Sequence, residues 1–311
     1  MNTDQPAFLV GSERSGSTLL RLMLDSHPGI INPGECDFLF DLVGDDGRLP
    51  EVFTYRHWLS INRVFLAMHL KVDDRLEYRD LIRSFLNQIS RPNTVLIVKV
   101  HRNLHRIPTL FPNARYIHLL RDPRDVARSC IGMGWAGHAF YGVDLWLEAE
   151  KSWDRLKSTL TKAQYFEVKY EDLLDNVEET LGTICEFLDL RYSAQMLDYA
   201  NRSTYSRPDK SLSYQWKRKY SRRELQLVEG KVGPMLLDRG YKPSGHPPAF
   251  PGFIERVGLF IRHKGFCVRH AIRRYGMALY LRSFIASKLG IRVWQEACQK
   301  ERNAIDTRYL K

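Results

Sequence analysis

The chain has 311 residues, of which 44% are hydrophobic and 27% charged, and this composition excludes a chain that is disordered throughout. The net charge of +11 is uneven, because residues 245–311 hold 13 Lys and Arg against 4 Asp and Glu, whereas residues 1–244 hold 34 against 32. Such an asymmetry indicates a surface that meets something anionic.

The cysteines and the N-terminal segment bear on the compartment. The five cysteines are scattered and form no CxxC pair, which disfavours a zinc site and a disulfide framework and favours a reducing compartment. Residues 1–6 are polar, the apolar run Ala7–Val10 is too short for a signal sequence, and no stretch approaches the ~18 apolar residues of a membrane-spanning helix. We therefore expect a cytoplasmic protein.

The first predicted elements are a strand over Ala7–Val10 and a helix over Leu19–Leu24, the opening unit of a parallel α/β sheet. Between them, Gly11–Thr18 has the glycine spacing of a nucleotide-triphosphate P-loop, with Ser17 in place of its lysine. Backbone N–H groups of such a loop can face an anion at the helix N-terminus. The loop suits a terminal phosphate or sulfate better than a triphosphate; the alternative is a Gly/Ser turn that binds nothing.

Further short apolar runs predict three more buried strands, Thr94–Val100, Arg115–Leu120 and Tyr165–Val168. Helical periodicity lies between and after them, over Tyr78–Ser90, Asp144–Leu160 and Val177–Leu188. Strands that alternate with helices predict a doubly wound α/β fold, with helices on both faces of a parallel sheet of the P-loop nucleotide-hydrolase kind.

A second polar motif follows the strand Arg115–Leu120. Arg121 comes directly after the strand, and Ser129 follows eight residues later on a predicted helix. Open α/β sheets bind ligands at the carboxyl ends of their strands, where an arginine can fork onto a phosphate and a serine adds a short donor. Taken alone, the segment also fits a charged loop with a solvated helix face.

Together these two motifs resemble those of the PAPS-dependent sulfotransferases, where PAPS is 3′-phosphoadenosine 5′-phosphosulfate. Gly11–Pro28 resembles the 5′-phosphosulfate loop, most closely that of the tyrosylprotein and related bacterial and carbohydrate enzymes, and Arg121–Ser129 resembles the 3′-phosphate motif; Met133 stands where the tyrosylprotein branch has a further arginine. The resemblance covers residues 7–241. It implies a set of nucleotide-binding residues: Arg14, Ser15, Gly16, Ser17, Thr18, Arg121, Ser129, Tyr170, Ser203 and Lys217.

Two residues compete for the role of general base, the group that takes the acceptor proton. Glu35 matches the catalytic glutamate of the tyrosylprotein branch and is favoured, whereas His101, in Lys-Val-His, matches the histidine base of the cytosolic small-molecule branch. Lys99 and Arg14 are expected to stabilise the leaving oxygen, and His105 is an outside candidate. No metal is expected, because the sequence offers no compact cluster of metal ligands.

The Pro/Gly-rich segment Lys242–Gly252 reads as a linker. It divides the chain into an expected sulfotransferase domain, residues 1–244, and a basic helical extension, residues 245–311. The extension mixes apolar and basic residues, so it either packs on the main domain or a second subunit, or lies on an anionic membrane. Nucleic acid is the weakest interpretation, since no recognition module is visible.

The predicted function is transfer of a sulfuryl group from PAPS to a hydroxyl or amine of a small-molecule, sugar or lipid-linked acceptor, releasing PAP. The segment Asp37–Ser90 is expected to shape the acceptor pocket. Two alternatives stay open. One is a small-molecule kinase, which the missing P-loop lysine disfavours; the other is a non-catalytic nucleotide-binding protein or membrane scaffold.

Overall fold

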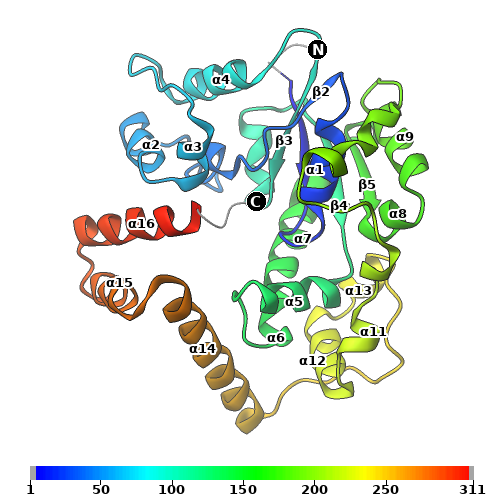
Figure 1. The fold of residues 1–311 in the computed structure, drawn as a ribbon, viewed down its shortest axis with the longest axis vertical. Helices are drawn as coiled ribbons and strands as arrows, with labels where there is room; N and C mark the ends of the chain where they lie inside the picture. Colours follow the sequence, from blue (N-terminus) through cyan, green and yellow to red (C-terminus); the bar gives the residue numbers. More distant parts are fainter. Residues whose placement is uncertain (1–4, 308–311) are drawn as a thin grey trace.

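The computed structural model describes residues 5–307 and is built around a five-stranded parallel sheet with the strand order β2-β3-β1-β4-β5 (Figure 1). Val10, at the end of the central strand, lies in register with Val100 on one side and His118 on the other. The carboxyl ends of three strands therefore meet at one edge. The strands are β1 Ala7–Val10, β2 Ile30–Ile31, β3 Val95–Val100, β4 Arg115–Leu120 and β5 Tyr165–Lys169.

Helices cover both faces of this sheet, because residues of both alternating sets along the central strands are apolar. Helices α1, α8 and α9 pack on the face that carries Leu9 and Ile117. Helices α2, α3, α4 and α7 pack on the face that carries Phe8 and Tyr116. Their bounds are α1 Ser17–Asp25, α2 Val52–Leu59, α3 Arg63–Met68, α4 Tyr78–Ile89, α7 Asp144–Lys157, α8 Tyr170–Asp175 and α9 Val177–Phe187.

The expected fold class is confirmed, and the predicted elements differ from the observed ones mainly at their ends. Strand β3 begins one residue later than predicted, at Val95, and β5 ends one residue later, at Lys169. The helix predicted to reach Leu160 ends at Lys157, because the chain then forms tight turns in which Thr159 N–H donates to the carbonyl of Leu156.

Shorter helices follow the sheet on the side of β4 and β5. Helix α5 begins directly after Asp122, whose side chain caps its first turn, and α12 begins with a capping box between Ser221 and Glu224. The bounds of these helices are α5 Pro123–Gly132, α6 Ala139–Gly142, α10 Tyr199–Arg202, α11 Trp216–Lys219, α12 Arg222–Val232 and α13 Met235–Asp238.

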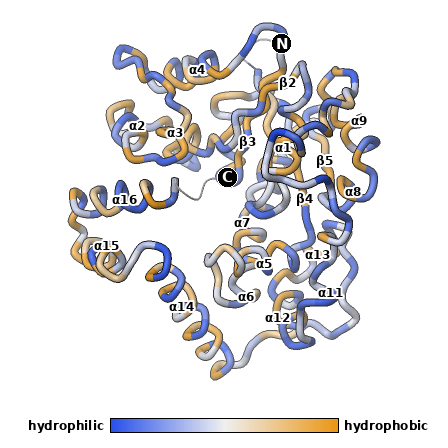
Figure 2. Tube along the Cα trace, in the orientation of Figure 1, coloured by the Kyte–Doolittle hydropathy of each residue, from blue (hydrophilic) through white to orange (hydrophobic). Residues whose placement is uncertain are grey.

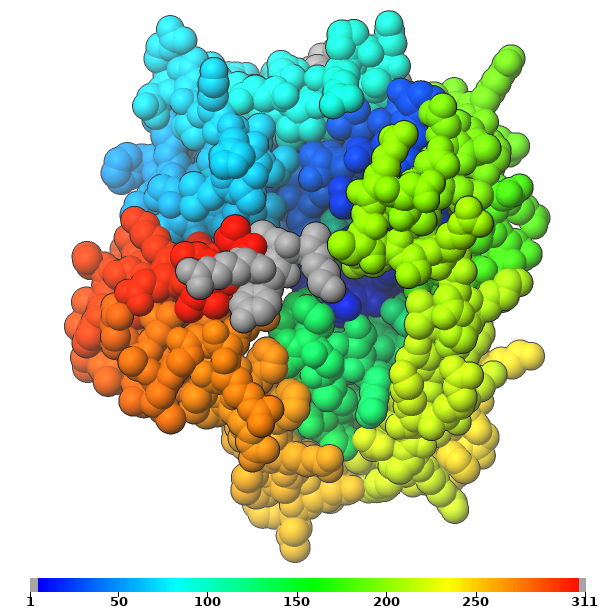
Figure 3. Space-filling model, in the orientation of Figure 1, coloured from blue at the N-terminus to red at the C-terminus, as the bar shows by residue number. Residues whose placement is uncertain are grey.

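A helical extension is also observed, made of α14 Phe253–Tyr275, α15 Met277–Leu289 and α16 Arg292–Thr307. The three helices run along one side of the molecule and return to α2 and α3, as the orange to red region beside the light blue one in Figure 3 shows. There Asn303 donates to the carbonyl of Ile61 over 2.9 Å, and His57 lies 2.8 Å from Glu296. None of the helices within residues 5–307 combines the length and the apolar character needed to cross a bilayer.

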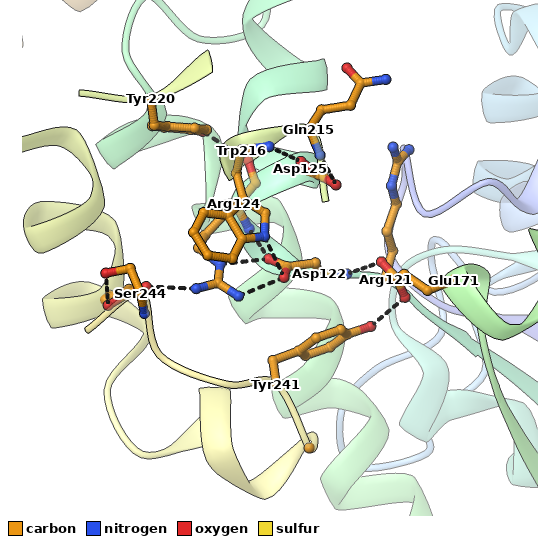
Figure 4. A network of polar contacts seen from close by, with 12 residues as sticks. Arg121, Asp122, Arg124, Asp125, Glu171, Gln215, Trp216, Tyr220, Tyr241 and Ser244 are labelled. Carbon is orange, nitrogen blue, oxygen red and sulfur yellow. Dashed lines mark hydrogen bonds and ion pairs between the residues drawn. The ribbon is translucent and has the colours of Figure 1, made fainter. Parts of the chain in front are cut away.

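A buried charge network joins the start of α5 to α11 and α12 (Figure 4). The guanidinium of Arg124 lies 2.7 Å from Asp122 and 2.6 Å from Glu229. The same guanidinium lies 3.6 Å from the ring centre of Trp216, whose indole N–H donates to Asp122 over 2.9 Å. Both carboxylates thus share one cationic partner, and all four side chains are buried.

Glu171, at the start of α8, extends the network (Figure 4). Its carboxyl group accepts hydrogen bonds from the backbone N–H of Asp122 and the hydroxyl of Tyr241, each at 3.0 Å. Burial raises the pKa of Glu171 to about 7, only partly opposed by these hydrogen bonds. The native protein thus holds a proton on a carboxyl group that the unfolded chain releases at lower pH.

We predict a pH-dependent stability that Glu171→Gln removes. Because the pKa rises from 4.5 to about 7 on folding, the folded state binds more protons between these values, and the free energy of unfolding falls as pH rises through them, by on the order of 3 kcal/mol. Urea denaturation at pH 5, 6, 7 and 8 measures the loss, and Glu171→Gln should flatten it. Glu186→Gln, at an exposed position of α9, is the control; equal slopes in all three proteins would contradict the prediction.

Candidate active site

The loop between β1 and α1 contains positive φ values, which glycine adopts more readily than other residues. Gly11 and Gly16 have φ values of 145° and 95°, and Arg14 adopts 68°, so the loop turns back on itself before the N-terminus of α1. A side chain at Gly11 would place its Cβ 2.3 Å from the carbonyl oxygen of Leu119. Within the described chain, the Ser15 hydroxyl is buried without a hydrogen-bond partner. An unpaired donor beside a helix N-terminus is the arrangement that an anion would satisfy.

Tyr170 connects this loop to the end of β4. A Cβ on Gly16 would lie 2.2 Å from the Tyr170 ring, so the ring rests directly on the glycine. On the other side, the Arg121 guanidinium lies 4.3 Å from the centre of the same ring. Arg121 also donates to the carbonyl of Arg14 over 3.1 Å, and among residues 5–307 its buried Nε has no hydrogen-bond partner. Gly16, Tyr170 and Arg121 thus form one stack, built from the chain that follows β1, β5 and β4.

A cavity of about 460 Å³ opens above this stack. Arg14, Gly16, Ser17, Thr18 and the Arg121–Tyr170 pair line one side of it, and residues 204–209 with Leu212 line the other. Ser129 stands behind it, where its hydroxyl accepts a 2.9 Å hydrogen bond from Arg14 Nε. The two sequence motifs, more than 100 residues apart, therefore converge on one cavity.

Four of the expected nucleotide-binding residues do not line this cavity. Ser15 is buried within the loop and Ser129 lies behind the cavity, whereas Ser203 and Lys217 make contacts elsewhere. The Ser203 hydroxyl accepts from the backbone N–H of Tyr205, and Lys217 lies over the rings of Tyr214 and Trp216 at 4.9 and 5.7 Å. The segment that does line it, Thr204–Asp209, was not singled out from the sequence. Its Tyr-Ser-Arg-Pro-Asp composition was the available signal, but it is common to many surface loops.

Glu35, Lys99 and His101 lie together at the end of β3. The chain before η1 (Asp37–Leu39) pairs with β3 through a bridge between Glu35 and Lys99. This places Glu35 Oε1 3.2 Å from Lys99 Nζ and 3.8 Å from His101 Nε2. The two candidate bases thus occupy one site. They differ in access, because 42% of the Glu35 side chain is exposed but only 3% of that of His101.

The charges of this cluster follow from its surroundings. Burial would raise the pKa of Glu35, but the charges of Lys99 and His101 and the hydrogen bond from Lys99 outweigh burial and hold it below its usual value. Burial lowers the pKa of Lys99, partly offset by the Glu35 carboxylate. Glu35 is therefore a carboxylate at neutral pH, 3.2 Å from the Lys99 amine.

The orientation of His101 is set by a hydrogen bond of 2.9 Å between its Nδ1 and the carbonyl oxygen of Gly11. A carbonyl only accepts, so Nδ1 carries the proton, and in the neutral ring Nε2 is left as an acceptor. The Ser17 hydroxyl lies 3.4 Å from that Nε2. His101 therefore links the phosphate loop to the Glu35–Lys99 pair.

A larger cavity of about 830 Å³ opens on the other side of Glu35. Its walls come from Asp37 and Phe38, from α2 and α3 with Trp58 and Asn62, and from α15 and α16. Of the aromatic side chains considered for a pocket, Phe38 and Trp58 line it, whereas Phe40 and Tyr55 are buried in the core and Phe53 is exposed. The contribution of α15 and α16 was not expected from the sequence.

Glu13 is another residue that the sequence analysis missed. It belongs to the phosphate loop and lines the larger cavity beside Glu35, and burial raises its pKa despite the opposing charge of His101. His105, the outside candidate, lies instead 2.9 Å from Asp45 in a neighbouring cavity. Within residues 5–307, no group of three or more His, Cys, Asp or Glu side chains is placed to hold a metal ion.

Comparisons with known proteins bear on the same region. Residues 6–194 match the model of the sulfotransferase family. A putative protein-tyrosine sulfotransferase of Caenorhabditis briggsae is 28% identical over 286 residues, 82% of this chain and 95% of that protein. A Mycobacterium bovis relative, the omega-hydroxy-beta-dihydromenaquinone-9 sulfotransferase, is 23% identical over 65% of this chain and 69% of its own length.

Among solved structures, the sulfotransferase domain from the curacin biosynthetic pathway superposes with a TM-score of 0.58 at 20% identity, covering 76% of this chain and 98% of that domain. This likeness shows that the two chains share a fold. The matched family range ends before α14, so the helices that complete the larger cavity lie outside it.

We predict that Gly16→Ala disrupts the site while a helical glycine tolerates the same change. At Gly16 the added Cβ meets the Tyr170 ring at 2.2 Å and the φ value is positive, so we expect a loss of stability of about 1–3 kcal/mol and at least tenfold weaker PAP binding. Gly182→Ala, where a Cβ meets no atom within 4 Å, should stabilise the protein by up to about 1 kcal/mol. Urea denaturation and calorimetric titration with PAP measure both effects; unchanged PAP affinity in Gly16→Ala would contradict the prediction.

Proposed function

Because the chain belongs to the sulfotransferase family, we propose that it transfers a sulfuryl group from PAPS in the smaller cavity to a hydroxyl or amine held in the larger one. The observation that carries the proposal is that the cluster reaches the walls of both cavities. Glu35 lines the larger cavity, and His101 Nε2 lies 3.4 Å from the hydroxyl of Ser17, which lines the smaller one. A general base must lie within hydrogen-bond reach of the acceptor's proton, and the acceptor must at the same time reach the donor's sulfur.

The smaller cavity suits the two phosphate ends of PAPS. In the proposed pose, the N-terminus of α1 and the hydroxyls of Ser15, Ser17 and Thr18 bind the 5′-phosphosulfate. Arg121 and Ser129 bind the 3′-phosphate, for which the unpaired Nε of Arg121 is available. Tyr170 and residues 204–209 enclose the nucleotide between them.

In the proposed step, the acceptor oxygen or nitrogen attacks the sulfur of PAPS in line with the bridging oxygen. The bond between sulfur and that oxygen breaks, PAP leaves with the electron pair, and the acceptor proton passes to the Glu35 carboxylate. Lys99 and Arg14 offset the negative charge that develops on PAP. His101 positions the cluster through its contacts with Gly11 and Ser17. Because the His101 side chain is buried and that of Glu35 is partly exposed, we favour Glu35 as the base.

The larger cavity indicates an acceptor with a polar, oxygen-rich group. Three of its lining residues, Trp58, Ser283 and Arg302, carry a buried donor atom without a partner among residues 5–307. Such donors favour a ligand with hydrogen-bond acceptors. A sugar, a hydroxylated metabolite or the head group of a lipid meets this requirement. Protein-tyrosine and menaquinone enzymes both occur among the relatives, so family membership leaves the acceptor open.

We predict selective binding of PAP through the 3′-phosphate contacts. Calorimetric titration should give tight binding of PAP and weak binding of ATP with magnesium. Arg121→Ala/Ser129→Ala should weaken PAP binding on the order of 100-fold, because it removes hydrogen bonds to a charged group. Arg128→Ala, an exposed arginine of the same helix, is the control. Tight ATP binding with weak PAP binding would overturn the proposal in favour of a kinase.

We predict that Glu35→Gln lowers the rate of sulfuryl transfer by ~10²–10⁴-fold while PAP affinity stays within twofold, since general-base catalysis contributes on that scale. The measurement is the formation of PAP in single-turnover reactions with a panel of hydroxylated acceptors. Glu51→Gln, at an exposed position before α2, is the matched control.

His101→Asn separates the two candidate bases in the same assay. If Glu35→Gln kept its rate and His101→Asn lost it, His101 would be the base. Full activity in both variants would contradict a catalytic role for the cluster.

A further inference from the structure

Helix α14 leaves a stripe of large apolar side chains in solvent. Phe253, Ile254 and Ile261 are 83, 86 and 65% exposed, and Val257 and Phe260 are about half exposed. Their spacing of three or four residues puts them on one side of the helix. The opposite side faces the protein, where His263 stacks on Tyr141 at 4.4 Å. The tube in Figure 2 shows hydrophobic residues recurring along α14 and α15.

Helix α15 continues this pattern directly after Gly276. Its exposed apolar residues are Met277, Leu281, Phe284, Ile285 and Leu289, again at helical spacing. We call these five residues and the five of α14 the apolar strip. Single exposed apolar residues are ordinary on a protein surface, but ten on two consecutive helices indicate a surface that meets an apolar partner.

The charged residues around the strip indicate the sign of the charge that its partner carries. Each of the four acidic residues within 253–307 is already paired within the protein, in Glu255–Arg223, Glu296–His57, Glu301–Arg282 and Asp306–Arg274. Basic side chains, in contrast, stay exposed along α14 and α15. They are Arg256, Arg262, Lys264, Arg269, Arg273 and Lys288. The surface therefore combines apolar side chains with an excess of positive charge.

We propose that α14 and α15 dock the protein on the surface of an anionic lipid bilayer. An amphipathic basic helix lies in the interfacial plane with its apolar side chains below the head groups, and lysine and arginine add attraction to anionic lipids. A second copy of this chain would bring the same positive charge to the interface, and a nucleic acid would leave the apolar strip unused. An anionic bilayer satisfies both properties of the surface.

The larger cavity adjoins this surface through shared lining residues. Three residues of its wall, Ser283, Ser287 and Arg302, also line a third cavity, of about 260 Å³. This third cavity extends to Phe284 of the apolar strip. Docking through the strip therefore places the route to the larger cavity at the membrane side of the protein.

Vesicle binding tests this proposal without any assay of sulfuryl transfer. The full chain is mixed with vesicles of phosphatidylcholine alone or with 30% phosphatidylglycerol, and the bound fraction is measured by flotation. We expect at least tenfold tighter binding to the anionic vesicles and a loss of most of that gain in 0.5 M NaCl. Ile254→Glu/Ile261→Glu should reduce binding at least tenfold.

The control is Phe53→Glu/Leu66→Glu, which adds the same charge at exposed apolar positions of α2 and α3 and should bind like the parent protein. Circular dichroism verifies that both double variants are folded. Equal losses in the two variants, or equal binding to both vesicle types, would overturn the proposal. So would a dimer in sedimentation equilibrium that Ile254→Glu/Ile261→Glu dissociates, because a second copy would then cover the strip.

Discussion

The buried guanidinium of Arg124 is the interaction on which the architecture around the smaller cavity depends. It pairs with Asp122 at the corner between β4 and α5 and with Glu229 on α12, and it stacks on Trp216. Removing Arg124 would leave two buried carboxylates without a cationic partner. The chain just before Trp216 lines one side of the smaller cavity with residues 204–209 and Leu212. The Arg124 cluster therefore positions this segment by holding Trp216, although the cluster binds no phosphate in our proposal.

The sheet explains how distant motifs meet. In the order β2-β3-β1-β4-β5, the first strand is central and its neighbours arrive from later parts of the chain. The loop after β1, His101 after β3 and Arg121 after β4 are consequently side by side, as expected where the strand order changes direction in an open α/β sheet. The positive φ of Gly16 and its contact with Tyr170 then add the end of β5 to the same site.

The sequence predicted what depends on local pattern. Strands β3 to β5, helix α4 and the two nucleotide motifs each have their signal within ten to twenty residues, so periodicity and glycine spacing located them within a few residues. The sequence offered Glu35 and His101 as rival bases at one cleft, but their separation of 3.8 Å was not predicted, because it depends on a single bridge between Glu35 and Lys99. The contacts of Asn303 with Ile61 and of Glu296 with His57 join segments more than 230 residues apart, and no local pattern encodes them. The outward position of Lys217 likewise depends on how Trp216 is held.

The return of α16 to α2 and α3 has a consequence for the order in which the protein is made. The smaller cavity and the Arg124–Glu229 pair that supports it are complete once α12 has been synthesised, but the wall of the larger cavity also needs Arg302 and Asn303. A nascent chain therefore holds all the residues of the smaller cavity before it holds those of the larger one. Under the proposed function, substitutions in α15 and α16 would change the acceptor cavity while the loop between β1 and α1 keeps its sequence.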